Sequence, residues 1–224
     1  MSAIDRSSPA SPASPASPTS PASPAPPASL EARIQLLLDK DELRELTFLY
    51  AHRIFASDWR GIANLFTEDG VLDYSPVVAL VRPAQVTQEH LDAGSDLIFV
   101  GRQAICDFIP TVGPLQVKGF FTNHVIRVDG DAAVGISWFE NRLVQQGESV
   151  AGAGRMCDEF KRVGGRWLIS YRRQELFYFT ALKEGWAESL DRARKIAPIP
   201  QRGWEAELIR DWGSPAAEPV EHRR

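Results

Sequence analysis

The chain has 224 residues, of which 44% are hydrophobic. This is enough to bury one substantial hydrophobic core, and nothing in the composition indicates a second core. Its formal net charge of −4 gives no electrostatic support for general binding to nucleic acid or to a membrane surface. No run approaches the roughly 20 apolar residues of a membrane span, and the two cysteines are too few for a disulfide framework. We therefore expect a soluble, cytoplasmic protein with one folded domain.

The amino-terminal segment is dominated by a Ser-Pro-Ala repeat between Ser8 and Ala25. It has neither the apolar core of a secretory signal nor the basic amphipathic helix of an organelle-targeting peptide. A proline-rich segment without hydrophobic residues cannot offset the entropy of ordering. Residues 1–29 are therefore predicted to form a disordered tail.

The folded domain is expected over residues 30–182, with a carboxy-terminal extension over residues 183–224. Large aromatic side chains rarely stand free in water, so part of this extension should pack on the domain or on a partner subunit. The aromatic residues concerned are Trp186, Trp204 and Trp212.

Apolar spacing predicts three helices before the first strand. A short lead-in helix is expected over residues 30–38, and a second helical pattern runs over residues 46–55. Ala56-Ser57-Asp58 should end this pattern and cap a further short helix that begins at Trp59. That short helix is expected to end at Glu68-Asp69-Gly70, before a strand over residues 71–74.

The next segment, residues 75–100, is longer than the usual connection of about 4 to 6 residues. Its valines argue against disorder, so it is either a lid over a site or a hairpin at the edge of the sheet. Residues 101–109 then predict another helix, which Pro110 helps to stop. Four long strands follow, separated by glycine-containing turns, over residues 120–128, 132–145, 151–162 and 167–178.

Three motifs carry a family resemblance. Residues 50–74 read Y-x(7)-D-W-x(6)-F-x-E-D-G-x-x-D-Y, residues 123–133 read NHVIRVDGDAA, and residues 160–170 read FKRVGGRWLIS. Over residues 38–178 the chain resembles the SnoaL-like, or NTF2-like, superfamily, which includes scytalone dehydratase, bile-acid dehydratase and polyketide cyclases. The resemblance implies an α+β fold, a cone-shaped barrel of curved antiparallel sheet wrapped by three amino-terminal helices, and a homodimer.

The acid/base dyad of the dehydratases does not carry over. In those enzymes an aspartate lies five residues after the tyrosine of the first helix, and a histidine lies about four residues before the Asn-His-Val strand. The matching positions here are Phe55 and Gly119. Neither residue can transfer a proton, so a different set of residues is needed for catalysis.

His124 is the best remaining candidate for a base, because strand alternation places it on the same face as Ile126 and Val128. The resemblance adds Tyr74, which matches a substrate-activating tyrosine of scytalone dehydratase, and Tyr50, which matches a tyrosine lining the bile-acid enzyme's pocket. Both could donate hydrogen bonds to a carbonyl or enolate, although tyrosines of this kind are more often core residues with satisfied hydroxyls. Asp158 could pair with His124 as a replacement dyad or form a structural salt bridge with an arginine.

Further residues are expected to line the substrate site: Phe55, Trp138, Asn141, Met156 and Arg172. No two histidines have metal-ligand spacing, so no metal is expected. The sequence contains no glycine-rich phosphate loop and no Gly-x-Ser-x-Gly motif, which argues against a nucleotide cofactor and against serine hydrolysis.

These observations predict a cofactor-free lyase or isomerase that performs dehydration, isomerisation or cyclisation. Its substrate would be a hydrophobic polyketide, steroid or aromatic intermediate. Because the dyad is missing, a noncatalytic ligand-binding or accessory subunit, of the kind found as oxygenase β-subunits, stays open. A third alternative is a partner module reached through the proline-rich tail.

Overall fold

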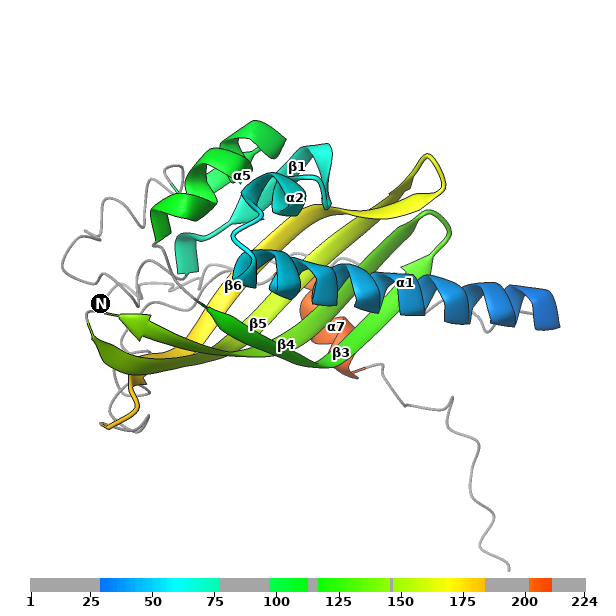
Figure 1. The fold of residues 1–224 in the computed structure, drawn as a ribbon. Helices are drawn as coiled ribbons and strands as arrows, with labels where there is room; N and C mark the ends of the chain where they lie inside the picture. Colours follow the sequence, from blue (N-terminus) through cyan, green and yellow to red (C-terminus); the bar gives the residue numbers. More distant parts are fainter. Residues whose placement is uncertain (1–28, 77–96, 113–116, 146, 184–201, 211–224) are drawn as a thin grey trace, which may run out of the picture.

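The computed structural model describes residues 29–76, 97–112, 117–145, 147–183 and 202–210. Its centre is one curved, six-stranded sheet in the order β2-β1-β6-β5-β4-β3 (Figure 1). The strands are β1 (Phe66–Asp73), β2 (Ile98–Val100), β3 (Lys118–Asp129), β4 (Ala132–Gln145), β5 (Glu148–Val163) and β6 (Arg166–Ala181). The fold is α+β as predicted, but the sheet is mixed and open, because β1 runs parallel to β6.

The four long strands contain the four predicted strand segments and extend one to three residues beyond most of their ends. Each turn between them contains glycine, and Gly164 and Gly165 have φ angles of +58° and +78°. Most residues with a Cβ avoid this left-handed region, so these glycines end β5 and allow the chain to return as β6.

Helix α1 (Leu30–Phe55) is one continuous helix of 26 residues rather than the two predicted segments. It begins after Ser29, whose side chain accepts a hydrogen bond from the Ala32 amide at 3.1 Å. The polar residues in its middle do not break it, because Asp39 is held there by Arg162 at 2.7 Å and by Gln35 at 2.9 Å. One face packs on the sheet and buries Asp39, Leu43, Leu46, Thr47 and Tyr50.

Helix α2 (Trp59–Ala63) begins where the sequence predicts, with the Asp58 carboxylate accepting a hydrogen bond from the Gly61 amide at 2.8 Å. It ends sooner than predicted. Glu68-Asp69-Gly70 lies inside β1, not in a turn. Strand β1 pairs with β6 at Phe66 and again at residues 71–73, with a register shift between them, and with β2 at residues 71–73. Helix α5 (Arg102–Phe108) continues into a 3-10 helix, η1 (Ile109–Val112).

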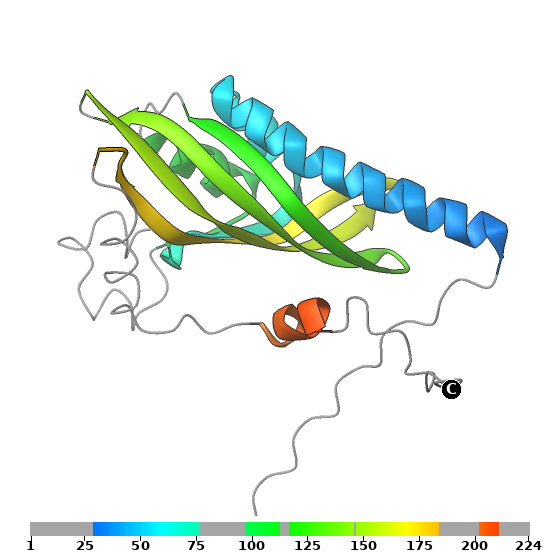
Figure 2. The same cartoon turned by 90° about the horizontal axis from the view of Figure 1, so that it is seen from below.

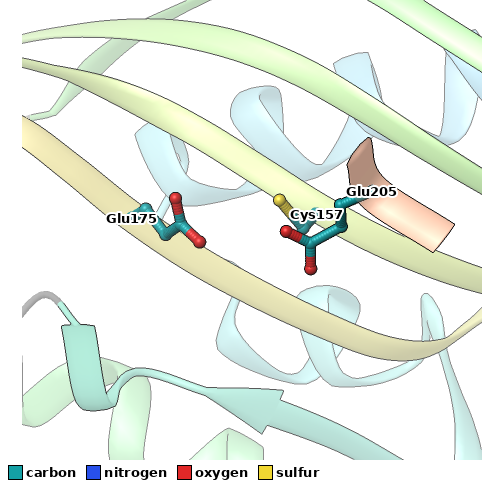
Figure 3. A group of neighbouring side chains, drawn as sticks. All are labelled: Cys157, Glu175 and Glu205. Atoms are coloured by element: carbon teal, nitrogen blue, oxygen red, sulfur yellow. The ribbon is translucent and has the colours of Figure 1, made fainter. Parts of the chain in front are cut away.

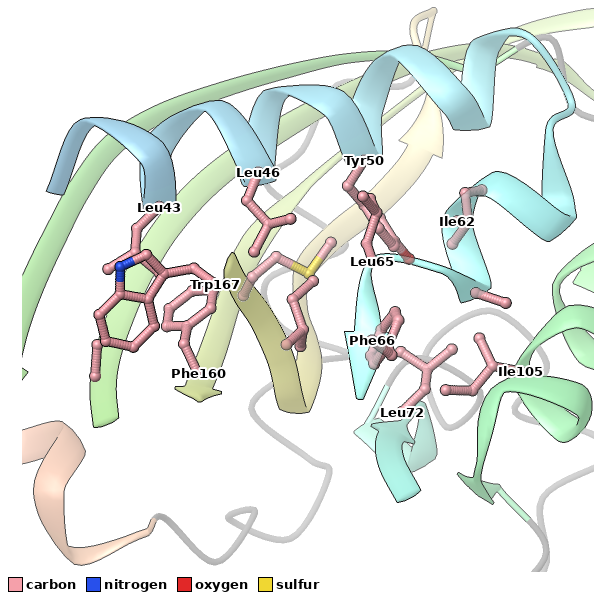
Figure 4. Packing of buried hydrophobic residues seen from close by; sticks show 14 of the residues in the cluster. Leu43, Leu46, Tyr50, Ile62, Leu65, Phe66, Leu72, Ile105, Phe160 and Trp167 are labelled. Carbon is pink, nitrogen blue, oxygen red and sulfur yellow. The ribbon is translucent and has the colours of Figure 1, made fainter. Parts of the chain in front are cut away.

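The sheet has two different faces. On the helix side, α1, α2 and α5 enclose the main hydrophobic cluster, in which α1 residues pack over side chains of β5 and β6 (Figure 4). On the outer side lies α7 (Gly203–Arg210), across the sheet from α1 (Figure 2). Leu208 and Trp204 of α7 pack against Ile136 and Cys157. The carboxy-terminal extension therefore returns to the sheet at Trp204.

Several predictions fall outside the described residues. These are the structure of the amino-terminal tail, most of the segment 75–100 with its suggested lid, and the positions of Trp186 and Trp212. Among the helices that are described, none combines the length and the apolar character that crossing a membrane would require.

Candidate functional site

Six polar side chains gather on the helix side of the sheet, and we call them the interior cluster. They come from six different elements or their ends: Tyr50, Tyr74, His124, Ser137, Asp158 and Arg172. Strand alternation turns the last four toward α1, where their strand neighbours Phe139, Met156 and Phe160 belong to the main core. The fold thus places a set of polar groups inside an otherwise apolar layer.

Asp158 and Arg172 form the centre of the interior cluster. Two hydrogen bonds join them: Arg172 Nε donates to Asp158 Oδ1 at 2.8 Å, and Nη2 donates to Oδ2 at 2.7 Å. Both side chains are 0% exposed. The two residues are direct neighbours in the pairing of β5 with β6. A two-pronged, fully buried pair of this kind fixes the guanidinium in one orientation.

Tyr50 lies beneath this guanidinium, whose central carbon is 4.3 Å from the centre of the phenol ring. Burial raises the pKa of Tyr50, although the Arg172 charge opposes the shift. Burial also raises the pKa of Tyr74, and a hydrogen bond with Gln174 opposes that shift. Both phenols therefore remain protonated at neutral pH and can act as hydrogen-bond donors.

His124 lies inside the molecule, as strand alternation predicts. Its ring centre is 6.5 Å from that of Phe160, and Nε2 would be only 3.0 Å from a Cβ placed on Gly135. The glycine at position 135 thus makes room for the imidazole. A bulge in β3, with Asn123 at φ +51°, shifts the register next to His124.

The imidazole is held in its neutral form. Burial lowers the pKa of His124 to about 3, and the charges of Arg172 and Arg44 add to the effect. Nδ1 and Nε2 are both buried without a hydrogen-bond partner in the described part of the protein. His124 and Asp158 are not hydrogen-bonded to each other, and Arg172 binds both carboxylate oxygens of Asp158.

This burial predicts a pH dependence of stability. The unfolded chain gains a proton at position 124 as the pH falls through about 6.5, whereas the folded protein does not until about pH 3. The contribution of neutral His124 to the free energy of unfolding is therefore fully present above pH 6.5 and is lost as the pH falls toward 3. Between pH 7 and pH 5, wild type should lose about 2 kcal/mol more unfolding free energy than His124→Gln does. Urea titrations at the two pH values measure this difference, and equal losses in both proteins would contradict it.

The most informative feature of the interior cluster is its unpaired polar atoms. Within the described residues, five buried side-chain polar atoms lack a hydrogen-bond partner, and four of them belong to this cluster. These four are His124 Nδ1, His124 Nε2, Ser137 Oγ and Arg172 Nη1. Buried polar groups are nearly always paired, with protein, water or ligand. Four of these atoms belong to side chains on the helix side of the sheet, and this makes the interior cluster the candidate site.

The other predicted site residues divide into two groups. Met156 is buried beside the interior cluster, and Asn141 lies half-buried on the same side of the sheet, next to Gly119. Phe55 and Trp138 are 56% and 47% exposed, so neither lines the cluster. Trp138 points to the outer side because its neighbours Ser137 and Phe139 point inward, and it packs on Phe177 at 5.2 Å between ring centres.

Two members of this neighbourhood were missed by the sequence analysis. Ser137 and Gln174 are both buried on the helix side. Strand alternation could have found Gln174, which lies two residues after Arg172 in β6 and so shares its face. Ser137 carried no comparable signal, because a serine in a strand is usually a surface residue.

A second polar cluster lies on the outer side, where Cys157, Glu175 and Glu205 approach one another closely enough to hold a metal ion (Figure 3). Arginine side chains already form ion pairs with the carboxylates of this cluster. Arg173 donates to Glu175 at 2.7 Å and to Glu205 at 2.6 Å, and Arg155 donates to Glu175 at 2.7 Å. Burial, followed by the nearby glutamates, raises the pKa of Cys157 to about 12, so the thiol keeps its proton. We interpret this cluster as the ion-pair network that attaches α7 to the sheet.

The SnoaL-like domain family matches residues 35–173, which is more than half of the chain. The chain belongs to the SnoaL-like family. Among curated proteins, none matches it.

Solved structures with the SnoaL-like fold support this assignment at the level of architecture. A proposed scytalone dehydratase from Novosphingobium aromaticivorans is 17% identical, with a TM-score of 0.52 over 65% of this chain and 88% of the other. A proposed aromatic ring hydroxylase from the same organism is 22% identical, with a TM-score of 0.53 over 70% and 97%. A type 2 hexachlorocyclohexane dehydrochlorinase, LinA, is 17% identical, with a TM-score of 0.54 over 67% and 93%. At these low identities, the TM-scores show a shared fold and nothing further.

Proposed function

We propose that this SnoaL-like protein is a cofactor-free lyase or isomerase that performs acid/base chemistry on a hydrophobic polyketide, steroid or aromatic compound. The observation that carries the proposal is the group of four unpaired polar atoms in the interior cluster. The interior cluster would combine a neutral base, a fixed cation and two protonated phenols. The names of two structural neighbours, a dehydratase and a dehydrochlorinase, denote elimination reactions and agree with this reaction class.

The proposed roles follow from charge. Arg172 Nη1 would donate a hydrogen bond to a substrate carbonyl oxygen, and Tyr50 or Tyr74 would donate another. His124 would remove a proton from the neighbouring carbon as negative charge develops on that oxygen. His124 is a weak base largely because it is buried and because Arg172 is positive. The negative charge that develops on the enolate oxygen would offset the positive charge of Arg172. The proton affinity of the imidazole would therefore rise as the proton is transferred.

The experiment is proton exchange in D₂O. Wild-type protein is incubated with a panel of aryl ketones and cyclic 1,3-diketones, and loss of the α-proton signal is followed by ¹H NMR. We expect exchange of at least one compound to be accelerated at least about 100-fold over buffer, the lower range for general base catalysis. Binding of these compounds without any accelerated exchange would instead support a noncatalytic ligand-binding subunit. The low basicity of His124 is the observation that favours this second candidate.

We also propose a homodimer. The solvent side of α1 carries exposed apolar side chains at helical spacing, and a second copy of the chain could cover them. They include Leu30 (70% exposed), Ile34 (48%), Leu37 (66%) and Leu38 (59%). Light scattering coupled to size-exclusion chromatography measures the mass directly, and a monomer at all concentrations would reject the proposal.

A further inference from the structure

A pocket of about 600 Å³ opens on the surface where the end of α1, helix α2, the start of α5 and the β5–β6 turn meet. In Figure 1, α5 lies beside α2 above the sheet, and the β5–β6 turn extends beyond them. The residues lining the pocket do not include any member of the interior cluster. Its volume falls within the range of about 300–1,000 Å³ typical of small-molecule sites. The pocket is therefore a candidate site that is separate from the one proposed above.

The lining of this pocket is strongly basic. It contains four arginines, Arg53, Arg60, Arg102 and Arg166, and one carboxylate, Asp58. The Asp58 carboxylate already has partners, because it accepts the capping hydrogen bond from the Gly61 amide at 2.8 Å and lies 3.9 Å from Arg53. Such a concentration of positive charge is unusual on a chain whose net charge is −4. Four like charges around one hollow repel one another, and a bound anion would relieve that repulsion.

The arginines are divided between fixed and available groups. Arg53 donates to the Gly61 carbonyl, and Arg102 Nε donates to the Phe66 carbonyl at 2.9 Å. These bonds to the backbone hold both side chains at the pocket. Within the described ranges, the guanidinium groups of Arg60 and Arg166 make no hydrogen bond or ion pair, so these planar donor groups are available to a ligand.

The remaining lining residues specify the rest of the ligand. Val163, 51% exposed, supplies most of the accessible apolar surface at the pocket, because Leu65 and Leu168 are 3% and 9% exposed. An inorganic ion would use only the arginines and leave this surface uncovered. Several guanidinium groups from different elements suit the three terminal oxygens of a phosphate ester better than they suit a single carboxylate.

We propose that this pocket binds a soluble organic phosphate, with the phosphate among the four arginines and an apolar group against Val163. The inference does not depend on the chemistry proposed for the interior cluster. It predicts a site whose affinity is set by charge and therefore weakens as salt increases.

Isothermal titration of the full chain with phenyl phosphate tests the proposal. We expect a dissociation constant below about 1 mM for wild type. The Arg60→Gln/Arg166→Gln variant should bind at least about tenfold more weakly, because two charge-assisted hydrogen-bonding groups are lost. The matched control is Arg33→Gln/Arg142→Gln, which removes the same charge from exposed positions away from the pocket and should bind like wild type. Circular dichroism establishes that each variant is folded.

Four results would overturn the inference, the last of them with phenol. The first is no binding of phenyl phosphate by folded wild type. The second is equal weakening in both double variants, which would mean nonspecific attraction to the protein's overall charge. The third is binding only to phosphatidylcholine vesicles that contain phosphatidic acid, which would assign the arginines to a lipid headgroup. Phenol in place of phenyl phosphate should not bind measurably, and phenol binding as tight as phenyl phosphate would also contradict the proposal.

Discussion

Replacing Asp158 with Asn should lower the free energy of unfolding by about 3–5 kcal/mol, the usual loss when one partner of a buried ion pair is removed. Arg172 would remain charged and 0% exposed with no carboxylate to pair with it. An amide can accept only part of the two-pronged hydrogen bonding that the carboxylate accepts now. Urea titration at pH 7, followed by circular dichroism, measures the change.

Two variants control this prediction. Asp131→Asn removes a carboxylate that also pairs with an arginine, Arg162, but is 81% exposed, so it should change stability by less than about 1 kcal/mol. Asp158→Leu combined with Arg172→Met removes the whole buried pair and should recover much of the loss. If Asp158→Asn were no more destabilising than Asp131→Asn, the buried pair would not be the structural centre of the interior cluster.

The second large effect is expected on proton exchange. For a compound that wild type exchanges, His124→Gln should lower the rate constant by about 10²–10⁴, the usual contribution of a positioned general base. Glutamine can keep a hydrogen-bonding group in the interior cluster, but it cannot take up a proton at neutral pH. The measurement is the same ¹H NMR time course in D₂O, run at equal concentrations of folded protein.

His52→Gln is the matched control, because His52 is exposed on α1 and lies outside the interior cluster. Its exchange rate should equal that of wild type. Undiminished exchange by His124→Gln would remove this histidine from the mechanism. A similar loss in both variants would show that the effect does not come from the interior cluster.

The sequence predicted the long strands because two independent signals agree there. Apolar alternation marks β3 to β6, and glycines such as Gly130 and Gly147, both with positive φ, mark the turns between them. It also placed His124 on the inner face, because the alternation with Ile126 survives the bulge at Asn123. These features depend on residues close together in the chain.

The features that were not predicted depend on contacts between distant residues. Glu68-Asp69-Gly70 has the composition of a turn, yet it lies in β1, and β1 pairs with a strand about a hundred residues later. The Asp158–Arg172 pair depends on the register of β5 with β6, which a shift between Glu159 and Phe160 alters. Phe55 was assigned by analogy to a family position, but near the end of α1 it points to solvent. Local pattern cannot determine any of these.

The most direct test of the central claim is a crystal structure of the protein with a compound that it exchanges. We predict that the compound's carbonyl oxygen lies within about 3.2 Å of Arg172 Nη1 and that its exchanging carbon faces an imidazole nitrogen of His124. A compound bound elsewhere, with both imidazole nitrogens and Nη1 still unpaired, would contradict the assignment of the interior cluster as the active site.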